Sequence, residues 1–168
     1  MYIYLLRHAI AELRDPIQYP DDSLRPLSKA GKDKFKRICS GMQRLGLHFE
    51  LVVCSPYIRA RQTAEIFCEE LKITKKRLIF TEHLTPFGNP EKLFEEISAQ
   101  HPNINSVVCV GHEPYLSELI STLLCGNASA SITLKKGGLC CLTLTHLDFS
   151  TYATLEWLLT PAQMIAMS

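Results

Sequence analysis

The chain has 168 residues and a formal net charge of +1, with 18 Lys and Arg against 17 Asp and Glu. This length fits one domain of ordinary size, so we expect residues 1–168 to form a single domain. The balanced charge lacks the basic field that nucleic-acid binding requires, so we expect no nucleic-acid partner. No run approaches the roughly 18 apolar residues of a membrane span, and the start lacks a signal-peptide layout. We therefore expect a cytoplasmic protein without a membrane partner.

The first predicted element is a strand at residues 2–6, a continuous apolar run that ends directly in Arg7-His8. In α/β enzymes, reactive groups lie past the carboxyl ends of buried strands, and this pair has that position. An irregular segment with three prolines and several carboxylates follows between Ala9 and Ser28. It is longer than most connections, and loops of that length are often functional.

Helical and strand patterns alternate in the rest of the chain. Ser28 is suited to cap a first helix, Gly46 to stop it, and Pro90 to occupy the first turn of a later helix. Apolar residues share helical faces in four groups: Phe35, Ile38, Met42 and Leu45; Ala60, Ala64, Phe67 and Leu71; Leu93, Phe94 and Ile97; and Leu116, Leu119, Ile120 and Leu123. Buried-strand patterns occupy residues 51–54, 106–110 and 139–144, with 153–158 as a further candidate. This alternation predicts a layered α/β sandwich.

Cysteine and histidine usage argues against disulfides and metal sites. The seven cysteines form an odd set without a Cys-x-x-Cys pair, so we interpret them as small buried hydrophobes, with Cys54, Cys109 and Cys140 inside strand runs. The six histidines show no close, regular spacing, so we expect no metal ion. Three of them are assigned to structural or surface positions: His48, His101 and His146.

Two later strand ends repeat the pattern of the first. Residues 55–59 follow the second strand and place Arg59 in the first turn of a helix, and residues 111–114 place His112 directly after the third. Because parallel strands end at one sheet edge, Arg7, His8, Arg59 and His112 can converge there. Two guanidiniums and two imidazoles would hold a phosphoryl group. The absence of a Gly-x-x-x-x-Gly-Lys loop and of a carboxylate cluster for magnesium disfavours common kinases and nucleotidases.

The four residues suggest a division of labour. His8 would attack phosphorus as a neutral nitrogen, provided that its other ring nitrogen is held as a donor, for example by a backbone carbonyl. Arg7, Arg59 and a donating His112 would stabilise charge on the phosphoryl oxygens.

Three neighbouring features are assigned to the surface or to local structure. Arg61 lies about 200° round the helix from Arg59 and is expected to be solvated. Glu113 is expected to complement a helix dipole. Residues 135–138 form a Lys-Lys-Gly-Gly turn, with docking of an acidic protein surface as the alternative reading.

Several motifs together resemble the histidine phosphatase superfamily, also called phosphoglycerate mutase-like. These are Leu-Leu-Arg-His at residues 5–8, Ser-Pro-Tyr-Ile-Arg-Ala-Arg-Gln-Thr-Ala at 55–64 and Val-Gly-His-Glu-Pro at 110–114, each after a predicted strand. Within it, Leu-Arg-Pro-Leu-Ser-Lys-Ala-Gly at 24–31 and Leu-Thr-Pro-Phe-Gly at 84–88 resemble the SixA-type phosphohistidine phosphatases.

This resemblance implies a three-layer α/β/α sandwich with a mixed, mostly parallel sheet. It implies that His8 is transiently phosphorylated, that Arg7, Arg59 and His112 complete the phosphate pocket, and that water then releases phosphate without a metal or organic cofactor. Arg25 stands in a recurring motif of the subgroup and either lines the pocket or pairs with Asp21 or Asp22.

The chain departs from the family pattern at two places. Ala9 stands where the usual signature has glycine, and the larger members' proton-donating glutamate has only Glu82 or His83 as counterparts. The segment 81–90 is too short for a large cap domain, which leaves an open pocket. Because the imidazole of phosphohistidine is a better leaving group than an alkoxide, the missing glutamate favours phosphohistidine as the substrate. The open pocket suits a phosphohistidine on a protein, such as a phosphorelay domain.

Two other functions stay open at this point. One is a phosphomonoesterase that acts on a metabolite with Glu82 or His83 as the acid. The other is a non-catalytic phosphate-binding scaffold on the same fold.

Overall fold

The computed structural model describes residues 1–168 and has a six-stranded sheet at its centre, in the order β3-β2-β4-β1-β5-β6. The strands are β1 (Tyr2–Arg7), β2 (Leu51–Cys54), β3 (Leu78–Phe80), β4 (Ser106–Gly111), β5 (Leu139–Thr143) and β6 (Thr154–Leu159). β3, β2, β4 and β1 pair in parallel, whereas β5 pairs antiparallel with both β1 and β6. The sheet is therefore mixed and mostly parallel, as expected.

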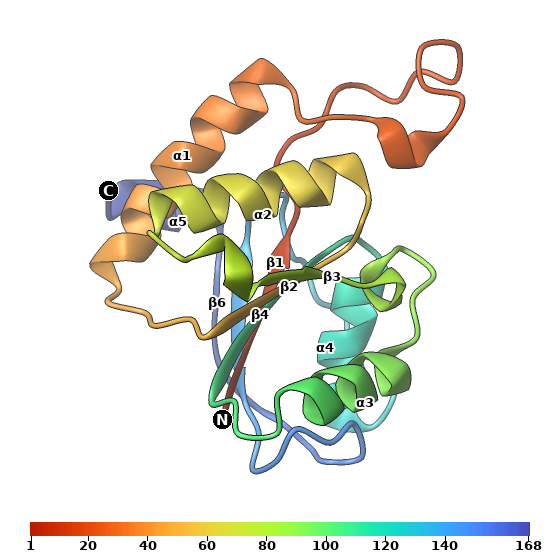
Figure 1. The fold of residues 1–168 in the computed structure, drawn as a ribbon, viewed down its shortest axis with the longest axis vertical. Coiled ribbons are helices and arrows are strands. Elements are labelled where there is room, and N and C mark those ends of the chain that lie inside the picture. The colour runs from red at the N-terminus through yellow and green to blue at the C-terminus, as the bar shows by residue number, and fades with distance from the viewer.

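Helices cover both faces of the sheet, and Figure 1 shows the three layers with the sheet between them. α1, α2 and α5 lie on one face, and α3 and α4 on the other. Their bounds are α1 (Lys29–Arg44), α2 (Ile58–Glu70), α3 (Pro90–Gln100), α4 (Tyr115–Cys125) and α5 (Pro161–Ala166), and three short 3₁₀ helices add η1 (Asp22–Leu24), η2 (Lys75–Arg77) and η3 (Glu82–Leu84). The three-layer α/β/α sandwich is confirmed.

The central strands explain why the sequence shows continuous apolar runs. Every residue of β2 and β4 is buried, because helices cover the sheet on both sides. Neighbouring side chains enter opposite layers: Leu6 packs in the cluster with Phe35 of α1, and Leu5 packs in the cluster with Leu116 of α4. The sheet is thus the shared wall of two hydrophobic cores.

The predicted helix boundaries agree closely with the structure. Ser28 caps α1 by accepting a hydrogen bond from the Gly31 N–H, and Gly46 lies just past its end with φ of +63°. Pro90 is the first residue of α3, whose N-cap is Asn89. Local capping chemistry therefore defines these ends.

The sequence patterns did not predict β3, α5 or any of the three 3₁₀ helices. β3 was missed because it has three residues and none of them is buried, so it lacks the apolar run of an interior strand. The segment 9–28 was treated as irregular, but it contains η1 and an isolated antiparallel bridge between Ala11 and Leu27. That bridge brings the ends of the long loop together.

The cysteines have the structural character expected of them. All seven are free, six of them are buried, and only Cys125 is exposed. Cys54, Cys109 and Cys140 lie inside β2, β4 and β5. Among the helices, none has the length and apolar character needed to cross a membrane.

Candidate active site

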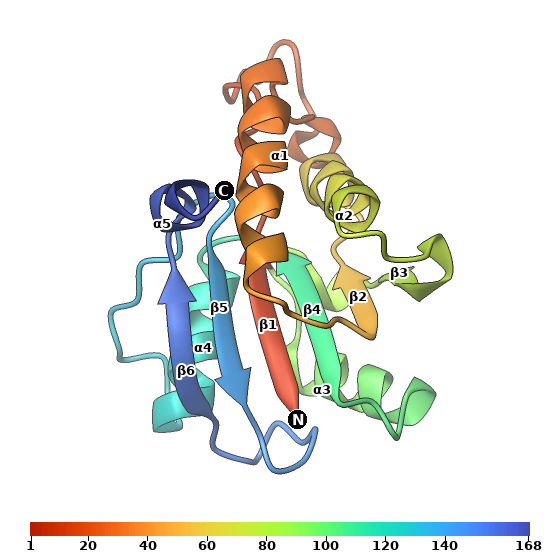
Figure 2. The ribbon, with the colours of Figure 1, turned by 90° about the vertical axis from the view of Figure 1, so that its left-hand side faces the viewer.

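The carboxyl ends of β1, β2 and β4 meet at one edge of the sheet, and Figure 2 shows β1 and β4 side by side there. Arg7 and Gly111 are register partners at the ends of β1 and β4, so His8 and His112 each follow at the same level. Their ring centroids lie 5.1 Å apart with an interplanar angle of 51°. The parallel sheet therefore brings together two histidines that are far apart in the sequence.

His8 is held with one ring nitrogen occupied and the other free. Its Nδ1 lies 2.7 Å from the Ala9 carbonyl oxygen, which only accepts, so Nδ1 carries the ring proton of the neutral form. This assignment leaves Nε2 with a lone pair. Burial, together with the charges of Arg59 and Arg7, lowers the pKa of His8 from 6.5 to about 3. His8 is therefore neutral at pH 7, as a nitrogen nucleophile must be.

Thr63 fixes the backbone beside His8. Its hydroxyl donates to the Arg59 carbonyl oxygen at 2.6 Å and accepts the Ala9 N–H at 3.0 Å. Thr63 is fully buried and belongs to α2, so these bonds connect α2 to the end of β1. Ala9 itself packs in a hydrophobic cluster, so the methyl group in place of glycine fits without conflict.

His112 is almost wholly buried, with 1% of its surface exposed. Its Nε2 lies 2.9 Å from Ser55 Oγ, which also accepts the Tyr57 N–H at 3.3 Å and so has its own proton free to donate to Nε2. In that tautomer Nδ1 carries a proton, and this nitrogen is buried without a partner. Burial and the nearby His8 lower the pKa of His112 to about 2, so it is a neutral donor.

Arg7 and Arg59 both keep an unused donor in the site. Arg7 donates from Nη1 to the Leu134 carbonyl oxygen at 2.8 Å, and Arg59 donates from Nη1 to the Asp22 carbonyl oxygen at 2.7 Å. In each guanidinium Nε is buried without a hydrogen-bond partner. Burial lowers both pKa values from 12.5, but guanidinium stays charged at neutral pH. Unpaired buried donors are costly, so the site is prepared for an acceptor.

Arg25 pairs with Asp22, one of the two arrangements that the sequence left open. Arg25 Nε lies 2.8 Å from Asp22 Oδ1, and the other carboxylate oxygen of Asp22 lies 3.1 Å from Arg59 Nη2. The hydrogen bond from Arg25 lowers the pKa of Asp22 below its ordinary value. Asp22 therefore connects Arg25, a residue of the long loop, to a residue of the central site.

The candidate acids are less closely joined to these residues. Glu82 and His83 lie on η3, Glu82 is exposed, and neither side chain forms a hydrogen bond or ion pair with the site.

Glu113 accepts a hydrogen bond from Ser117, and its second oxygen is buried without a partner. Burial raises the pKa of Glu113.

Two other surface assignments can be compared with the structure. Arg61 lies 3.1 Å from Glu65 on the exposed side of α2, as expected. His48, His101 and His146 form no side-chain hydrogen bond with any residue of the site. Sequence reasoning missed Thr63 and Ser55, although both stand inside the motif 55–64, because their roles depend on contacts across 54 and 57 residues.

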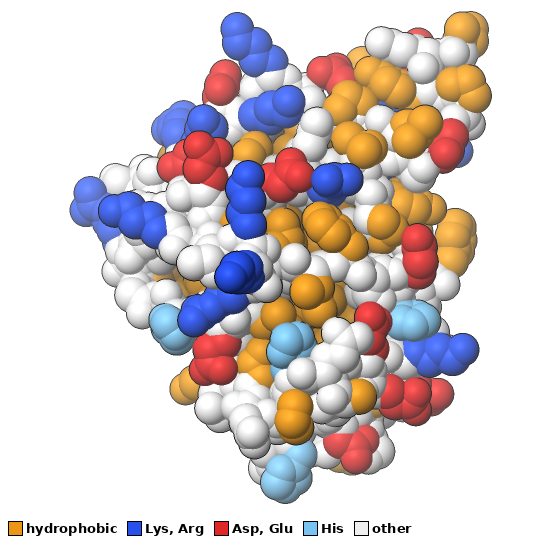
Figure 3. Space-filling view, viewed as in Figure 1, with side chains coloured by type: hydrophobic (Ala, Val, Ile, Leu, Met, Phe, Trp, Pro, Cys, Tyr) orange, Lys and Arg blue, Asp and Glu red, His pale blue; other side chains and the backbone are white.

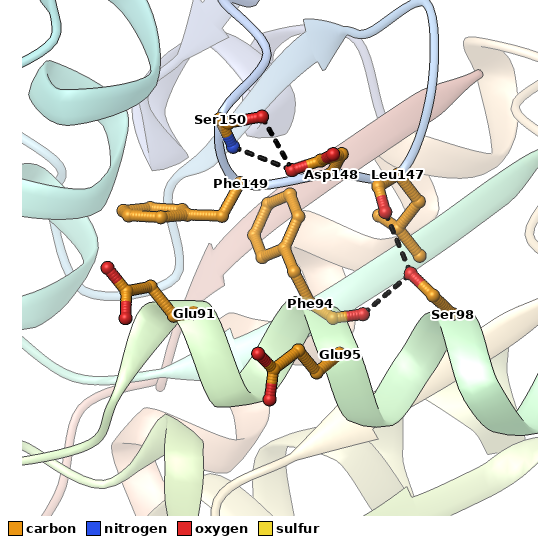
Figure 4. A pocket seen from close by; sticks show the side chains of 8 residues that line it. All are labelled: Glu91, Phe94, Glu95, Ser98, Leu147, Asp148, Phe149 and Ser150. Atoms are coloured by element: carbon orange, nitrogen blue, oxygen red, sulfur yellow. Dashed lines mark hydrogen bonds between the residues drawn. The ribbon is translucent and has the colours of Figure 1, made fainter.

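A clear cavity lies at the opposite edge of the sheet, and Figure 4 shows its lining. It encloses about 640 Å³ between α3 and residues 147–150, with Phe94 and Phe149 beside the carboxylates of Glu91, Glu95 and Asp148. The segment 147–150 follows β5, whose end lies beside the start of β1, where the Met1 amino group donates to the Leu144 carbonyl oxygen at 2.7 Å. The cavity is therefore separate from His8 and His112.

Comparisons with known proteins agree with this geometry. The model of the histidine phosphatase superfamily (branch 1) matches residues 3–85. An uncharacterized protein of Picosynechococcus sp. is 34% identical over 140 residues, which cover 83% of this chain and 82% of that protein. The phosphohistidine phosphatase SixA of Escherichia coli is 26% identical over 165 residues, which cover 98% and 96% of the two chains. A solved structure of the protein histidine phosphatase SixA complexed with tungstate has a TM-score of 0.80 and 26% identity, covering 96% of this chain and 98% of that one.

Proposed function

Because the chain belongs to the histidine phosphatase superfamily and is a phosphatase, we propose that it hydrolyses phosphohistidine on a protein through a phosphorylated His8. The observation that carries this proposal is the tautomer of His8. Its Nδ1 is bound to the Ala9 carbonyl oxygen, so Nε2 keeps a free lone pair, and the nearby charges of Arg59 and Arg7 help to keep the ring neutral. The relative from Escherichia coli is named a phosphohistidine phosphatase, which supports the choice of substrate.

In the first step, His8 Nε2 attacks the phosphorus atom. A P–N bond forms to His8 while the P–N bond to the substrate histidine breaks, and the released electron pair stays on the substrate nitrogen, which takes a proton from water. The free Nε donors of Arg7 and Arg59 and the Nδ1 proton of His112 would contact the phosphoryl oxygens. The Ala9 carbonyl oxygen, which accepts from Nδ1, stabilises the positive charge that develops on the His8 ring.

In the second step, a water oxygen attacks phosphorus and the P–Nε2 bond of His8 breaks. The electron pair returns to Nε2, the water loses a proton, and inorganic phosphate leaves. The low pKa of His8 favours the return of a neutral ring, because a charged ring is poorly tolerated at this buried position. No step requires a metal ion or an organic cofactor.

Arg25 has an outer position in this proposal. Asp22 joins it to Arg59, so Arg25 would contact a phosphoryl oxygen or an adjacent group of the substrate from beside Arg59. Its side chain would extend the pocket toward the long loop. Asp22 would keep the two arginines apart at a fixed spacing.

A nitrogen leaving group suits this site better than an alkoxide. Glu82 is exposed and has no bond to the site, so an acid comparable to that of the larger relatives is not held in place. An imidazole leaves with less need for a proton than an alkoxide does. This difference favours phosphohistidine over phosphate esters of sugars.

Exposed apolar side chains near the site support a protein as the carrier of the phosphohistidine. Leu13, Ile17 and Leu24 of the long loop are 87%, 92% and 59% exposed, and Phe87 after η3 is 93% exposed. Figure 3 shows hydrophobic side chains gathered at the upper right, over the long loop. Exposed apolar groups of this kind mark protein-binding surfaces.

We also propose a cytoplasmic location. All seven cysteines are free, which suits a reducing compartment, where thiols stay reduced. Phosphorelay proteins with a histidine-borne phosphoryl group would be the partners there.

The experiment compares two substrate classes at equal concentrations. The enzyme is incubated with a protein phosphorylated on histidine and, separately, with a panel of sugar and nucleotide phosphates, and phosphate release is followed for each. The proposal expects release from the phosphoprotein and at least about a hundredfold lower kcat/KM for the esters, a difference of roughly 2.7 kcal/mol in the barrier. Turnover of a metabolite without action on the phosphoprotein would overturn it in favour of a phosphomonoesterase. If neither class is hydrolysed, the scaffold alternative stands.

A further inference from the structure

The turn at residues 134–138 is attached to both sides of Arg7 and His8. The Leu134 carbonyl oxygen accepts from Arg7 Nη1 at 2.8 Å, and the Gly138 carbonyl oxygen accepts the Arg7 N–H at 3.2 Å. Gly137, at φ of +78°, donates its N–H to the carbonyl oxygens of Arg7 and His8 at 3.0 and 3.2 Å. This turn therefore belongs to the wall of the site, whereas the sequence predicted a turn into the next strand, with docking of an acidic protein surface as the alternative.

Lys136 stands in this turn and adds a positive charge to an already positive site. Its turn is bound to the backbone of Arg7 and His8, so Lys136 follows directly on a segment that contacts the site. Burial lowers the pKa of Lys136, and the charges of Arg7, Arg25 and Arg59 lower it further. The turn therefore adds a cation next to the end of β1.

Lys136 has no acidic partner of its own. The ion pairs of the structure join Arg25 and Arg59 to Asp22, Lys36 to Glu70, and Arg61 to Glu65, and none includes Lys136. A cation placed beside other cations without a counter-ion costs free energy, unless a multiply charged anion binds among them. A phosphoryl group is such an anion.

We propose that Lys136 is a substrate-binding residue that contacts the solvent-facing oxygen of the phosphoryl group, opposite the buried donors of Arg7 and Arg59. The proposal rests on the proposed function, because it takes the bound anion to be the phosphoryl group of the substrate. Lys136 is exposed and has a long flexible stem, so its ammonium group can reach the anion and withdraw when phosphate leaves. Lys135, which is also exposed, has the same charge and provides a matched control.

The competing interpretation is that the two lysines contact an acidic patch on the partner protein. A docking role would change KM for the phosphoprotein but would leave the binding of a small oxyanion unchanged. A phosphate-binding role would weaken both. Tungstate separates the two, because it probes the oxyanion site without any partner protein.

The experiment compares the wild type with three variants, Lys136→Gln, Lys136→Arg and Lys135→Gln. For each protein, titration calorimetry measures the affinity for tungstate, and a kinetic assay measures KM and kcat for a histidine-phosphorylated protein. Loss of one charged contact at an exposed position should weaken tungstate binding about five- to tenfold in Lys136→Gln and raise KM by a similar factor. Lys136→Arg keeps the charge, so its tungstate affinity should stay within about threefold of the wild type. The tungstate affinity of Lys135→Gln should stay within about twofold. Thermal melts confirm that each variant is folded.

Unchanged tungstate affinity in Lys136→Gln would overturn the proposal, and so would an equal loss in Lys135→Gln. An enzyme whose tungstate binding depends on Lys136 but which leaves phosphohistidine intact would contradict the proposed function and not the assignment of Lys136. A wild-type protein that does not bind tungstate would contradict both.

Discussion

The two edges of the sheet carry groups of opposite character. At the carboxyl edge, His8, His112 and Arg59 are buried, and both Arg7 and Arg59 have a buried donor without a partner. At the other edge, an open cavity of about 640 Å³ lies between α3 and residues 147–150, with carboxylates and phenyl rings in its lining. The histidine edge is distinguished by its chemical groups, and the cavity beside α3 is distinguished by its shape.

This difference indicates that the proposed reaction would depend on buried charge and unused donors more than on the size of a cavity. Burial opposes charge on all four groups, so the two histidines stay neutral, whereas the two guanidiniums keep a charge that is costly to bury. The carboxylates at the opposite edge are polar groups at a surface, and no cation is among the lining residues there. Substitutions should therefore separate the two edges by several orders of magnitude in activity.

The largest expected effect comes from His8→Ala. Without the Nε2 lone pair, the phosphoryl group has no acceptor on the enzyme, so kcat should fall by roughly 10³-fold or more. This fall in kcat is measured as the rate of phosphate release from a histidine-phosphorylated protein. The exposed His48 supplies the control, and His48→Ala should keep wild-type kcat. Retention of the parent activity by His8→Ala would contradict the mechanism.

Arg59→Gln should be the next most damaging change. It removes a buried guanidinium that lies beside the reacting group, and kcat/KM should fall about 10²- to 10³-fold. Arg61→Gln, two residues further along α2, is the matched control. Arg61 contacts only Glu65 and the Phe80 ring on the exposed face, so this variant should lose less than about twofold. Equal losses in the two variants would show that the position of the charge is irrelevant.

Thr63→Val tests the link between α2 and the end of β1. Valine has a similar shape but neither donates nor accepts, so the Ala9 N–H and the Arg59 carbonyl oxygen lose their partner. The free energy of unfolding should fall by about 2 kcal/mol, and kcat by about tenfold as His8 loses its fixed position. Thr63→Ser keeps the hydroxyl and should restore most of kcat, which a purely steric role would not predict.

Acid should destabilise the fold through the same two histidines. Their pKa values are about 3 for His8 and about 2 for His112, against 6.5 ordinarily. Between pH 6.5 and about 3 the unfolded chain therefore binds more protons, and the free energy of unfolding falls as the pH falls through this window. Thermal melts from pH 7 to 4 should show a smaller decrease in Tm for His112→Gln than for the wild type.

The smallest effect is expected at the opposite edge. Glu95 follows Glu91 by one helical turn in α3, so Glu95→Gln removes a like-charge neighbour and should raise Tm by about 1 °C at most. Its kcat/KM should stay within about twofold of the wild type. A large loss of activity would show that the two edges are coupled, and would remove the contrast between them.

Much of the central site could be predicted from the sequence because its parts follow strand ends directly. Arg7, His8 and His112 come immediately after apolar runs, and parallel pairing then fixes their proximity. β3 could not be predicted in this way, because a short partly exposed strand has no distinctive pattern. The predicted pairing of Arg25 was ambiguous, since local spacing does not tell whether Asp21 or Asp22 lies nearer.

The supporting contacts could not be predicted because they are tertiary. Thr63 acts on Ala9 from a helix 54 residues away, and Ser55 acts on His112 across 57 residues. The turn that carries Lys136 lies beside the site only because its backbone is bound to the end of β1. Such roles arise from the way in which the layers pack, and a single sequence carries no local sign of them.

The most direct test of the account is to locate the phosphoryl group during turnover. The enzyme is mixed with an isotopically labelled histidine-phosphorylated protein, quenched within milliseconds under alkaline conditions that preserve phosphohistidine, digested and mapped by mass spectrometry. The account predicts label on the peptide that contains His8, absent from His8→Ala and retained in Lys135→Gln. Turnover without any label on His8, or with label on another residue, would contradict it.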